Sequence, residues 1–220
     1  MVALNRIILN LVLQKYGVGN GMMLPYQLRL DGLIAVTIDS NVWNLLFDLN
    51  LDLATELPAD RFKLFIPREV EIELAAIPEC AEKLALKNYI RAQIDAAQVH
   101  TLWVFGFDNN GDGPQRCGGF DVGTWQSETE RKFYDLICER YLLSKTTTNS
   151  QLSRNEGDAA LGANSFSSVV LTLDFKQGPL TVALANGGKI LDMRPFREAG
   201  MDLASYVTAY YNASQMSDGQ

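Results

Sequence analysis

Two aspartates stand where short apolar runs of the sequence end. Asp39 closes AVTI and Asp174 closes SVVLTL. Such β-branched runs are typical of strands buried in a parallel sheet. In an open α/β sheet, ligands bind beyond the carboxyl ends of the strands, where strand order reverses. If the two strands are neighbours, both aspartates face one pocket, and carboxylates that share a pocket repel unless protons or a metal ion neutralise them. The pair therefore suggests a divalent-metal site.

An alternation of strands and helices is expected to position these acids. Residues 34–78 read as strand, helix, strand and helix, with the second strand, KLFIP, stopped by Pro67. Residues 156–200 return to helix, strand, helix and strand, and a final helix is expected over about 201–213. This order predicts right-handed βαβ units and a parallel sheet.

Further acids lie on the predicted helices. In REVEIELAAI, Glu73 borders the apolar helix face, whereas Glu69 and Glu71 are expected in solvent or near the helix N-terminus, where the helix dipole favours them. Asp158 lies in the first turn of the small-residue helix GDAALGA, which can pack closely on a sheet. Taken singly, Glu73 and Asp158 are better explained as surface or helix-start acids, whereas the strand-end aspartates are equally well explained as turn residues.

Composition sets broad limits on the protein class. The 220 residues, 47% apolar and 20% charged, suit one large globular domain or a domain with an insertion. The net charge of −7 argues against a non-specific, charge-driven nucleic-acid binder, but it permits an enzyme with a local basic surface. Three cysteines without CxxC spacing indicate a reduced, cytoplasmic protein. No apolar run is long enough to predict a membrane span.

Three parts of the chain are distinguished. Residues 1–33 form an N-terminal helical extension, 34–200 form the main domain with an insertion at about 79–155, and 201–220 form a C-terminal helix and tail. The N-terminal VALNRIILNLVLQKYG reads as an amphipathic helix and not as a signal peptide. Within the insertion, a strand is expected in VHTLWVFGF (99–107), and a capping box that begins at Ser127 opens a helix.

A basic stripe is predicted on the first helix of the insertion. Lys83, Lys87 and Arg91 recur every four residues, so they share one helix face. Such a stripe can track a nucleic-acid backbone. The alternative is a solvated amphipathic helix on which Glu79 and Glu82 pair with these cations.

The loop FDNNGDGPQRCGG raises a second metal hypothesis. Asp108, Asn110, Asp112 and Gly113 match the opening of an EF-hand calcium loop. The twelfth position, which requires a glutamate, is Gly119. The loop is therefore interpreted as a glycine-rich turn region.

Four short motifs, in order, resemble the PIN domain, a family of metal-dependent nucleases that includes toxin ribonucleases and RNA-processing enzymes. They are D-S-N-V-W after the first strand, I-P-x-x-V-x-x-E-L after the second, G-D-A-A-L-G-A on a later helix and L-T-x-D closing another strand. The resemblance covers about 34–78 and 155–193. It implies a three-layer α/β/α sandwich with a parallel sheet and a four-acid site for Mg²⁺ or Mn²⁺.

The resemblance also implies a role for each matched residue. The catalytic, metal-binding acids are Asp39, Glu73, Asp158 and Asp174. Asn41 and Thr172 match flanking polar positions that support such a site. The implied activity is hydrolysis of RNA phosphodiester bonds, with an antitoxin protein and a homodimer as possible assemblies. The insertion and the long lead-in depart from the shorter members of the family.

The chemistry of these ligands agrees with that activity. Mg²⁺ prefers oxygen ligands, and bound metal ions activate water and stabilise the leaving oxygen in displacement at phosphorus. No histidine base is required, and His100, the one histidine, is interpreted as structural or surface-exposed. Two alternatives stay open: a non-catalytic module that binds nucleic acid or protein, and a structure-selective DNA nuclease.

Overall fold

A five-stranded parallel sheet forms the centre of the protein. The computed structural model describes residues 23–106, 114–142 and 150–218. The strands are β1 (Ile34–Ile38), β2 (Phe62–Pro67), β3 (His100–Leu102), β6 (Val169–Thr172) and β7 (Ile190–Asp192). Their order is β3-β2-β1-β6-β7, and every neighbouring pair is parallel. The predicted α/β class and parallel sheet are confirmed.

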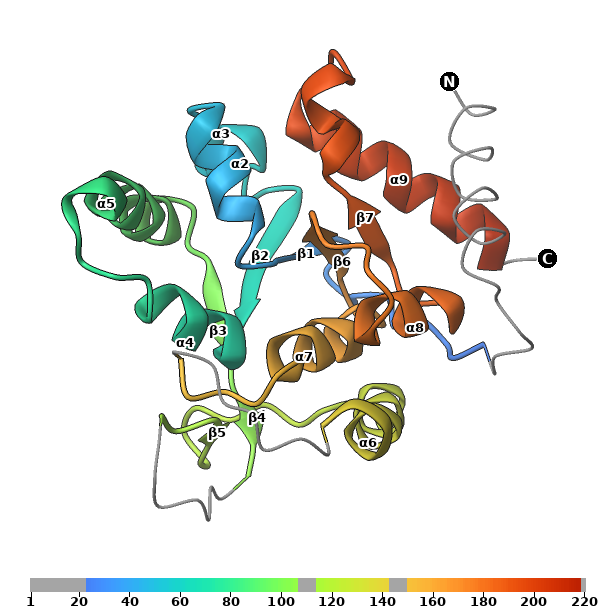
Figure 1. The fold of residues 1–220 in the computed structure, drawn as a ribbon. Coiled ribbons are helices and arrows are strands. Elements are labelled where there is room, and N and C mark those ends of the chain that lie inside the picture. Colours follow the sequence, from blue (N-terminus) through green and yellow to red (C-terminus); the bar gives the residue numbers. More distant parts are fainter. Residues whose placement is uncertain (1–22, 107–113, 143–149, 219–220) are drawn as a thin grey trace.

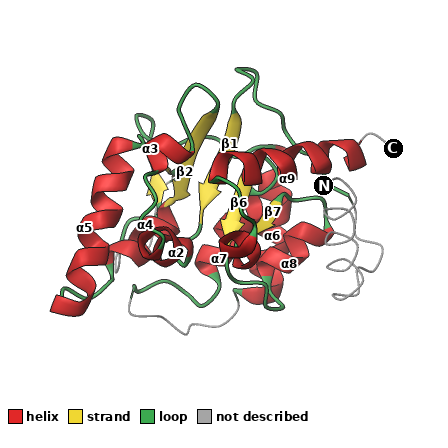
Figure 2. Ribbon diagram, turned by 90° about the horizontal axis from the view of Figure 1, so that it is seen from above, coloured by secondary structure: helices red, strands yellow, loops and turns green. Residues whose placement is uncertain are grey.

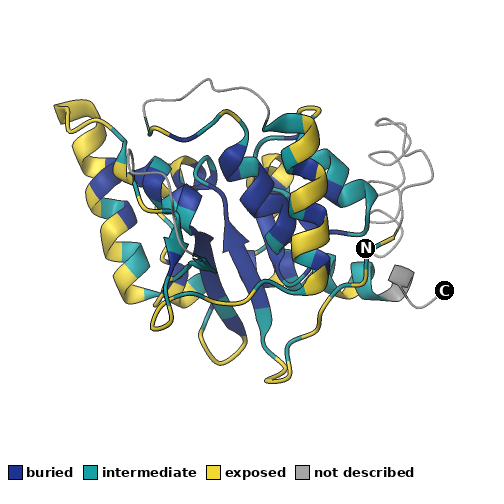
Figure 3. Ribbon diagram, turned by 90° about the horizontal axis from the view of Figure 1, so that it is seen from below, coloured by how far each residue is buried: buried dark blue, intermediate teal, exposed yellow. Residues whose placement is uncertain are grey.

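Burial explains why these residues form strands. All four residues of β6 are buried, as are four of the five in β1, so both faces of the central strands lie within the protein. β-branched side chains pack well on such a surface. In the register, Ile38 lies opposite Leu171, so β1 and β6 end at the same edge of the sheet. The strands are the darkest elements in Figure 3, and exposed residues gather on the outer faces of the helices.

Helices cover both faces of the sheet (Figure 1). One side carries α2 (Val42–Asp48), α3 (Leu53–Glu56), α5 (Ala81–Ala96) and α9 (Leu203–Asp218). The other carries α7 (Glu156–Asn164), α8 (Pro179–Ala185) and α6 (Glu128–Tyr141), which packs on α7. The helix α4 (Arg68–Ala75) begins directly after β2 and contacts α7. A short 3₁₀ helix follows β7 at Arg194–Glu198.

The small residues of α7 permit close packing. A Cβ atom on Gly162 would lie 2.8 Å from Cε1 of Phe133 in α6, nearer than packed carbons approach. Ser127 and Glu130 form the predicted capping box at the start of α6. The glycine contact therefore packs α7 closely on α6, and the N-terminus of α7 lies toward the edge where β1 and β6 end. Figure 2 shows α2, α4 and α7 around that edge.

The predicted strand over 99–107 is wrong as a single element. β3 ends at Leu102, and Val104–Phe105 form a separate strand, β4, which pairs in parallel with β5 (Cys117–Gly118) in a second, small sheet. β4 leaves the main sheet to pair with β5, and glycine backbones approach closely there. A Cβ on Gly123 would lie 2.4 Å from the carbonyl oxygen of Gly118. A hydrophobicity pattern carries no information on such a contact.

The remaining sequence predictions concern the C-terminal helix, the cysteines, membrane spans and two segments outside the described ranges. The C-terminal helix is longer than 201–213, since α9 spans Leu203–Asp218. The three cysteines are free thiols. Within the described ranges, no helix has the length and apolarity needed to cross a bilayer. The residues of the predicted N-terminal helix, and Asp108 to Gly113 of the calcium-loop hypothesis, lie outside the described residues.

Candidate metal centre

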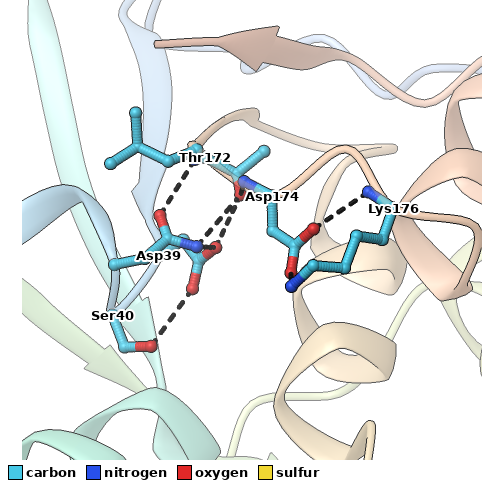
Figure 4. A network of polar contacts seen from close by, with 7 residues as sticks. Asp39, Ser40, Thr172, Asp174 and Lys176 are labelled. Atoms are coloured by element: carbon cyan, nitrogen blue, oxygen red, sulfur yellow. Dashed lines mark hydrogen bonds and ion pairs between the residues drawn. The ribbon is translucent and has the colours of Figure 1, made fainter. Parts of the chain in front are cut away.

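Asp39 is a buried carboxylate held at the junction of two strands. It follows β1 and is 3% exposed. Its backbone N–H donates to the carbonyl of Leu171 on β6, at 3.1 Å. The Thr172 hydroxyl donates to Asp39 Oδ2 at 2.6 Å, and the Ser40 hydroxyl lies 3.3 Å from Oδ1 (Figure 4). Burial raises the pKa of Asp39, and the hydrogen bonds from Thr172 and Ser40 oppose that shift. The carboxylate is therefore oriented by its neighbours at an energetic cost.

Asn41 ties the ends of β1 and β6 together. Its Nδ2 donates to Asp39 Oδ2 at 2.6 Å, while its Oδ1 accepts the backbone N–H of Leu173 at 2.9 Å. Thr172 Oγ1 also accepts the N–H of Asp174, at 2.9 Å. Asn41 and Thr172 thus contact the candidate acid directly.

Asp174 is the more open acid of the strand-end pair, with its side chain 32% exposed. The Lys176 backbone N–H donates to Oδ1 at 2.9 Å, and its ammonium donates to Oδ2 at 3.0 Å (Figure 4). Burial disfavours the charged form of Asp174, but the contacts with Lys176 outweigh it, so its pKa is lowered. Asp174 therefore stays ionised in neutral solution.

Asp158 is surrounded by the other three acids. It lies in the first turn of α7, where burial, followed by the charges of Asp39, Asp174 and Glu73, raises its pKa to about 7. Each of these charges disfavours ionisation of a neighbouring carboxyl. The structure therefore brings the four predicted acids to one edge of the sheet, and we call Asp39, Glu73, Asp158 and Asp174 the four-acid site.

The Glu73 side chain extends from α4 toward the site and passes beside Gly157. Burial and the charges of Asp39 and Glu156 raise the pKa of Glu73, and the nearby Ser40 hydroxyl opposes that shift. Glu73 Oε1 lies only 2.8 Å from where a Cβ on Gly157 would stand. Gly157 thus leaves the space that the glutamate occupies beside the α7 N-terminus.

The donor set fits a hard divalent cation in chemistry. Its carboxylate oxygens are the ligands that Mg²⁺ and Mn²⁺ prefer, and Mg²⁺ keeps several waters and takes only one or two protein carboxylates. Within residues 23–106, 114–142 and 150–218, no three His, Cys, Asp or Glu side chains are arranged so that they could already hold a metal ion. A cation would therefore be held by a few carboxylates, completed by water and a substrate phosphate.

Three residues near the site were missed or misjudged by sequence reasoning. Glu69 was expected in solvent or in the first helical turn; the helix position is confirmed, but solvent exposure is wrong because Glu69 is 8% exposed. Glu156 is also buried and pairs with Arg116 from the β4–β5 region. The pair joins segments forty residues apart, which no local pattern indicates.

The predicted basic stripe lies on α5, and two of its cations are paired. Lys87 is buried, and its Nζ lies 3.1 Å from Glu79 Oε1. Arg91 lies 3.7 Å from the same oxygen, while Lys83 is exposed. This pairing agrees with the alternative interpretation, in which α5 is an amphipathic helix and Glu79 pairs with its cations. His100 is exposed on β3 beside Phe65, in agreement with a structural or surface role.

Comparison with known proteins leaves the site to be judged on its own geometry. No protein-family model matches the sequence, and no curated protein is significantly similar to it.

Proposed function

We propose that this protein is a Mg²⁺- or Mn²⁺-dependent endoribonuclease of the PIN type, which hydrolyses RNA phosphodiester bonds at the four-acid site. The observation that supports this proposal most strongly is that Asp158 lies close enough to Asp39, Glu73 and Asp174 for their charges to raise its pKa. Four acids from separate segments thus meet where an open parallel sheet binds ligands. A three-layer arrangement with helices on both sheet faces agrees with this type of nuclease.

The chain's own residues prepare this site in distinct ways. Thr172 and Asn41 aim one oxygen of Asp39 and favour its ionised form by donating to it, against the burial that raises its pKa. Asp158 and Glu73 hold partly buried carboxyl groups, and the repulsion between them favours cation binding. A bound divalent cation would supply the Lewis acidity that activates water for displacement at phosphorus. The ammonium of Lys176, 88% exposed, is placed to meet substrate phosphate beside Asp174.

Cleavage assays with a charge-removing variant test the proposal. Labelled RNA and single-stranded DNA are incubated with Mn²⁺, Mg²⁺ or EDTA. We expect wild type to cut RNA only with metal, and Asp39→Asn to lose at least about 100-fold in rate, because an amide keeps the shape but removes one ligand charge. Asp48→Asn is the matched control, since Asp48 is exposed and pairs with Arg197 outside the site. Its rate should equal that of wild type.

The other outcomes separate the two remaining alternatives. Calorimetry that detects no binding of Mn²⁺ to folded wild type would overturn the nuclease proposal and favour a non-catalytic binding module. Metal-dependent cleavage of DNA in preference to RNA would favour a structure-selective DNA nuclease. Equal rates for Asp39→Asn and wild type would show that chemistry occurs elsewhere.

A further inference from the structure

A cavity of about 870 Å³ lies on the face of the sheet that carries α6 and α7. Its size falls within the range of small-molecule sites. Lys63, Phe65 and Pro67 line it, and because alternate residues of a strand share one face, the cavity follows β2 along its length. We call it the β2 cavity.

Glu69 places a carboxylate at the carboxyl end of the β2 cavity. It lines the cavity and is 8% exposed. In the part of the chain that the structure describes, this carboxylate accepts a hydrogen bond from its own backbone N–H and from no other residue. Burial and the charge of Glu156 raise the pKa of Glu69 to about 7, against the opposing charges of Arg116 and Arg68. A buried acceptor with spare capacity calls for a donor from a ligand.

The remaining walls supply aromatic surface and positive charge. Trp125 lines the cavity, is 79% exposed and stacks on Phe105 with ring centroids 4.3 Å apart, so its other face is open. At the opposite end, Lys63 and Arg29, the latter paired with Asp31, lie over the Phe65 ring, at 6.0 and 5.9 Å from its centroid. Aromatic faces that stack on bases, combined with cations along a groove, are the features of sites for single-stranded nucleic acid.

The β2 cavity also adjoins the four-acid site. Arg116 lines the cavity and forms an ion pair with Glu156, whose charge in turn raises the pKa of Glu73. Glu69, which lines the cavity, and Glu73 also lie one turn apart on α4, so the cavity ends close to the four-acid site. A strand that places a phosphate at the four acids can reach the cavity with a neighbouring nucleotide.

We infer that the β2 cavity binds a nucleobase with an exocyclic amino group, next to the phosphate that lies at the four-acid site. This inference rests on the proposed function. A glutamate carboxylate accepts a hydrogen bond from the amino group of cytosine. Uracil carries an oxygen at the same ring position and would repel the carboxylate.

Hexamers of cytidine and uridine form a matched pair of probes. Fluorescence anisotropy is measured in EDTA at about pH 8, above the usual glutamate range, so that no metal-dependent cleavage occurs. We expect wild type to bind the cytidine hexamer about tenfold more tightly. Glu69→Gln should reduce that ratio to about twofold or less, because an amide both donates and accepts. Glu71→Gln is the control, since Glu71 lies on the same helix, pairs with Arg68 and is not among the cavity-lining residues.

A second variant makes the test independent of whether Glu69→Gln folds. Trp125→Leu changes an exposed side chain and should weaken both hexamers about fivefold without altering their ratio. Equal affinity of wild type for the two hexamers, or an unchanged ratio in folded Glu69→Gln, would overturn the inference. Because these measurements exclude metal, discrimination between the hexamers can stand even if the nuclease proposal fails, and cleavage can stand even if discrimination is absent.

Discussion

The four-acid site and the β2 cavity lie beside the same sheet but are built in different ways. Two acids of the site follow strands whose register aligns their ends, and the other two come from helices that begin at that edge. The cavity instead arises because β4, β5, α6 and the segment before β1 cover β2 incompletely. Strand register therefore places the first region, whereas the second depends on contacts between distant segments.

Gly157→Ala is the variant expected to distinguish the four-acid site from the β2 cavity by the largest effect. The new methyl group meets Glu73 Oε1, the end of a flexible side chain, so the carboxylate moves while the fold does not. Alanine is also the better helix former by about 1 kcal/mol. We expect metal-dependent RNA cleavage to fall about 100-fold, because a misplaced reacting group costs that much, with an unchanged or higher urea midpoint.

The same substitution five residues later in α7 serves as the comparison. In Gly162→Ala the methyl group meets the buried ring of Phe133, which cannot move away without disturbing the core. This variant should lose about 1–3 kcal/mol of stability and keep most of its activity when folded. If both variants lose stability equally and cut RNA equally, Gly157 has no special relation to Glu73.

A variant on the cavity side should give an intermediate effect. In Gly123→Ala the methyl group meets backbone, at 2.4 Å from the Gly118 carbonyl oxygen and 2.8 Å from Cα of Phe105, so β4 and β5 must separate. We expect a loss of about 1–3 kcal/mol in unfolding free energy and altered tryptophan fluorescence from Trp103 and Trp125. Mn²⁺ affinity, measured by calorimetry, should stay within about twofold of wild type. A matching loss of metal affinity would show that the two regions are one unit.

These regions also differ in how much the sequence predicts. Asp39 and Asp174 are recognisable because a buried parallel strand is a continuous apolar run, and its end is visible in the sequence. Glu73 and Asp158 lie on predicted helices near that edge, but only the family resemblance singles them out as site residues. The sequence predicts one strand over 99–107. It does not predict the break after Leu102, because a hydrophobicity pattern carries no information on the contact between Gly118 and Gly123. Glu69 was misjudged since the residues that bury it, such as Arg116, come from a distant segment.

The smallest expected effect is on the stability of the metal-free protein, and it concerns the four-acid site alone. Folding raises the pKa of Asp158 from an ordinary 3.8 to about 7, so the folded state binds more protons than the unfolded state between these values. Stability conferred by the protonated form is therefore complete below about pH 4 and is lost as pH rises toward 7. Asp158→Asn removes this dependence, because an amide does not ionise.

Urea unfolding in EDTA measures this difference directly. The variant and wild type should be about equally stable near pH 4, and the variant should be more stable by about 1 kcal/mol or more near pH 8. Saturating Mn²⁺ should stabilise wild type but not the variant, which reverses their order. The buried Glu69 at the β2 cavity also has a raised pKa, but it is present in both proteins and cancels in their difference. A difference that stays constant from pH 4 to pH 8 would mean that burial and the charges of the other three acids do not raise the pKa of Asp158.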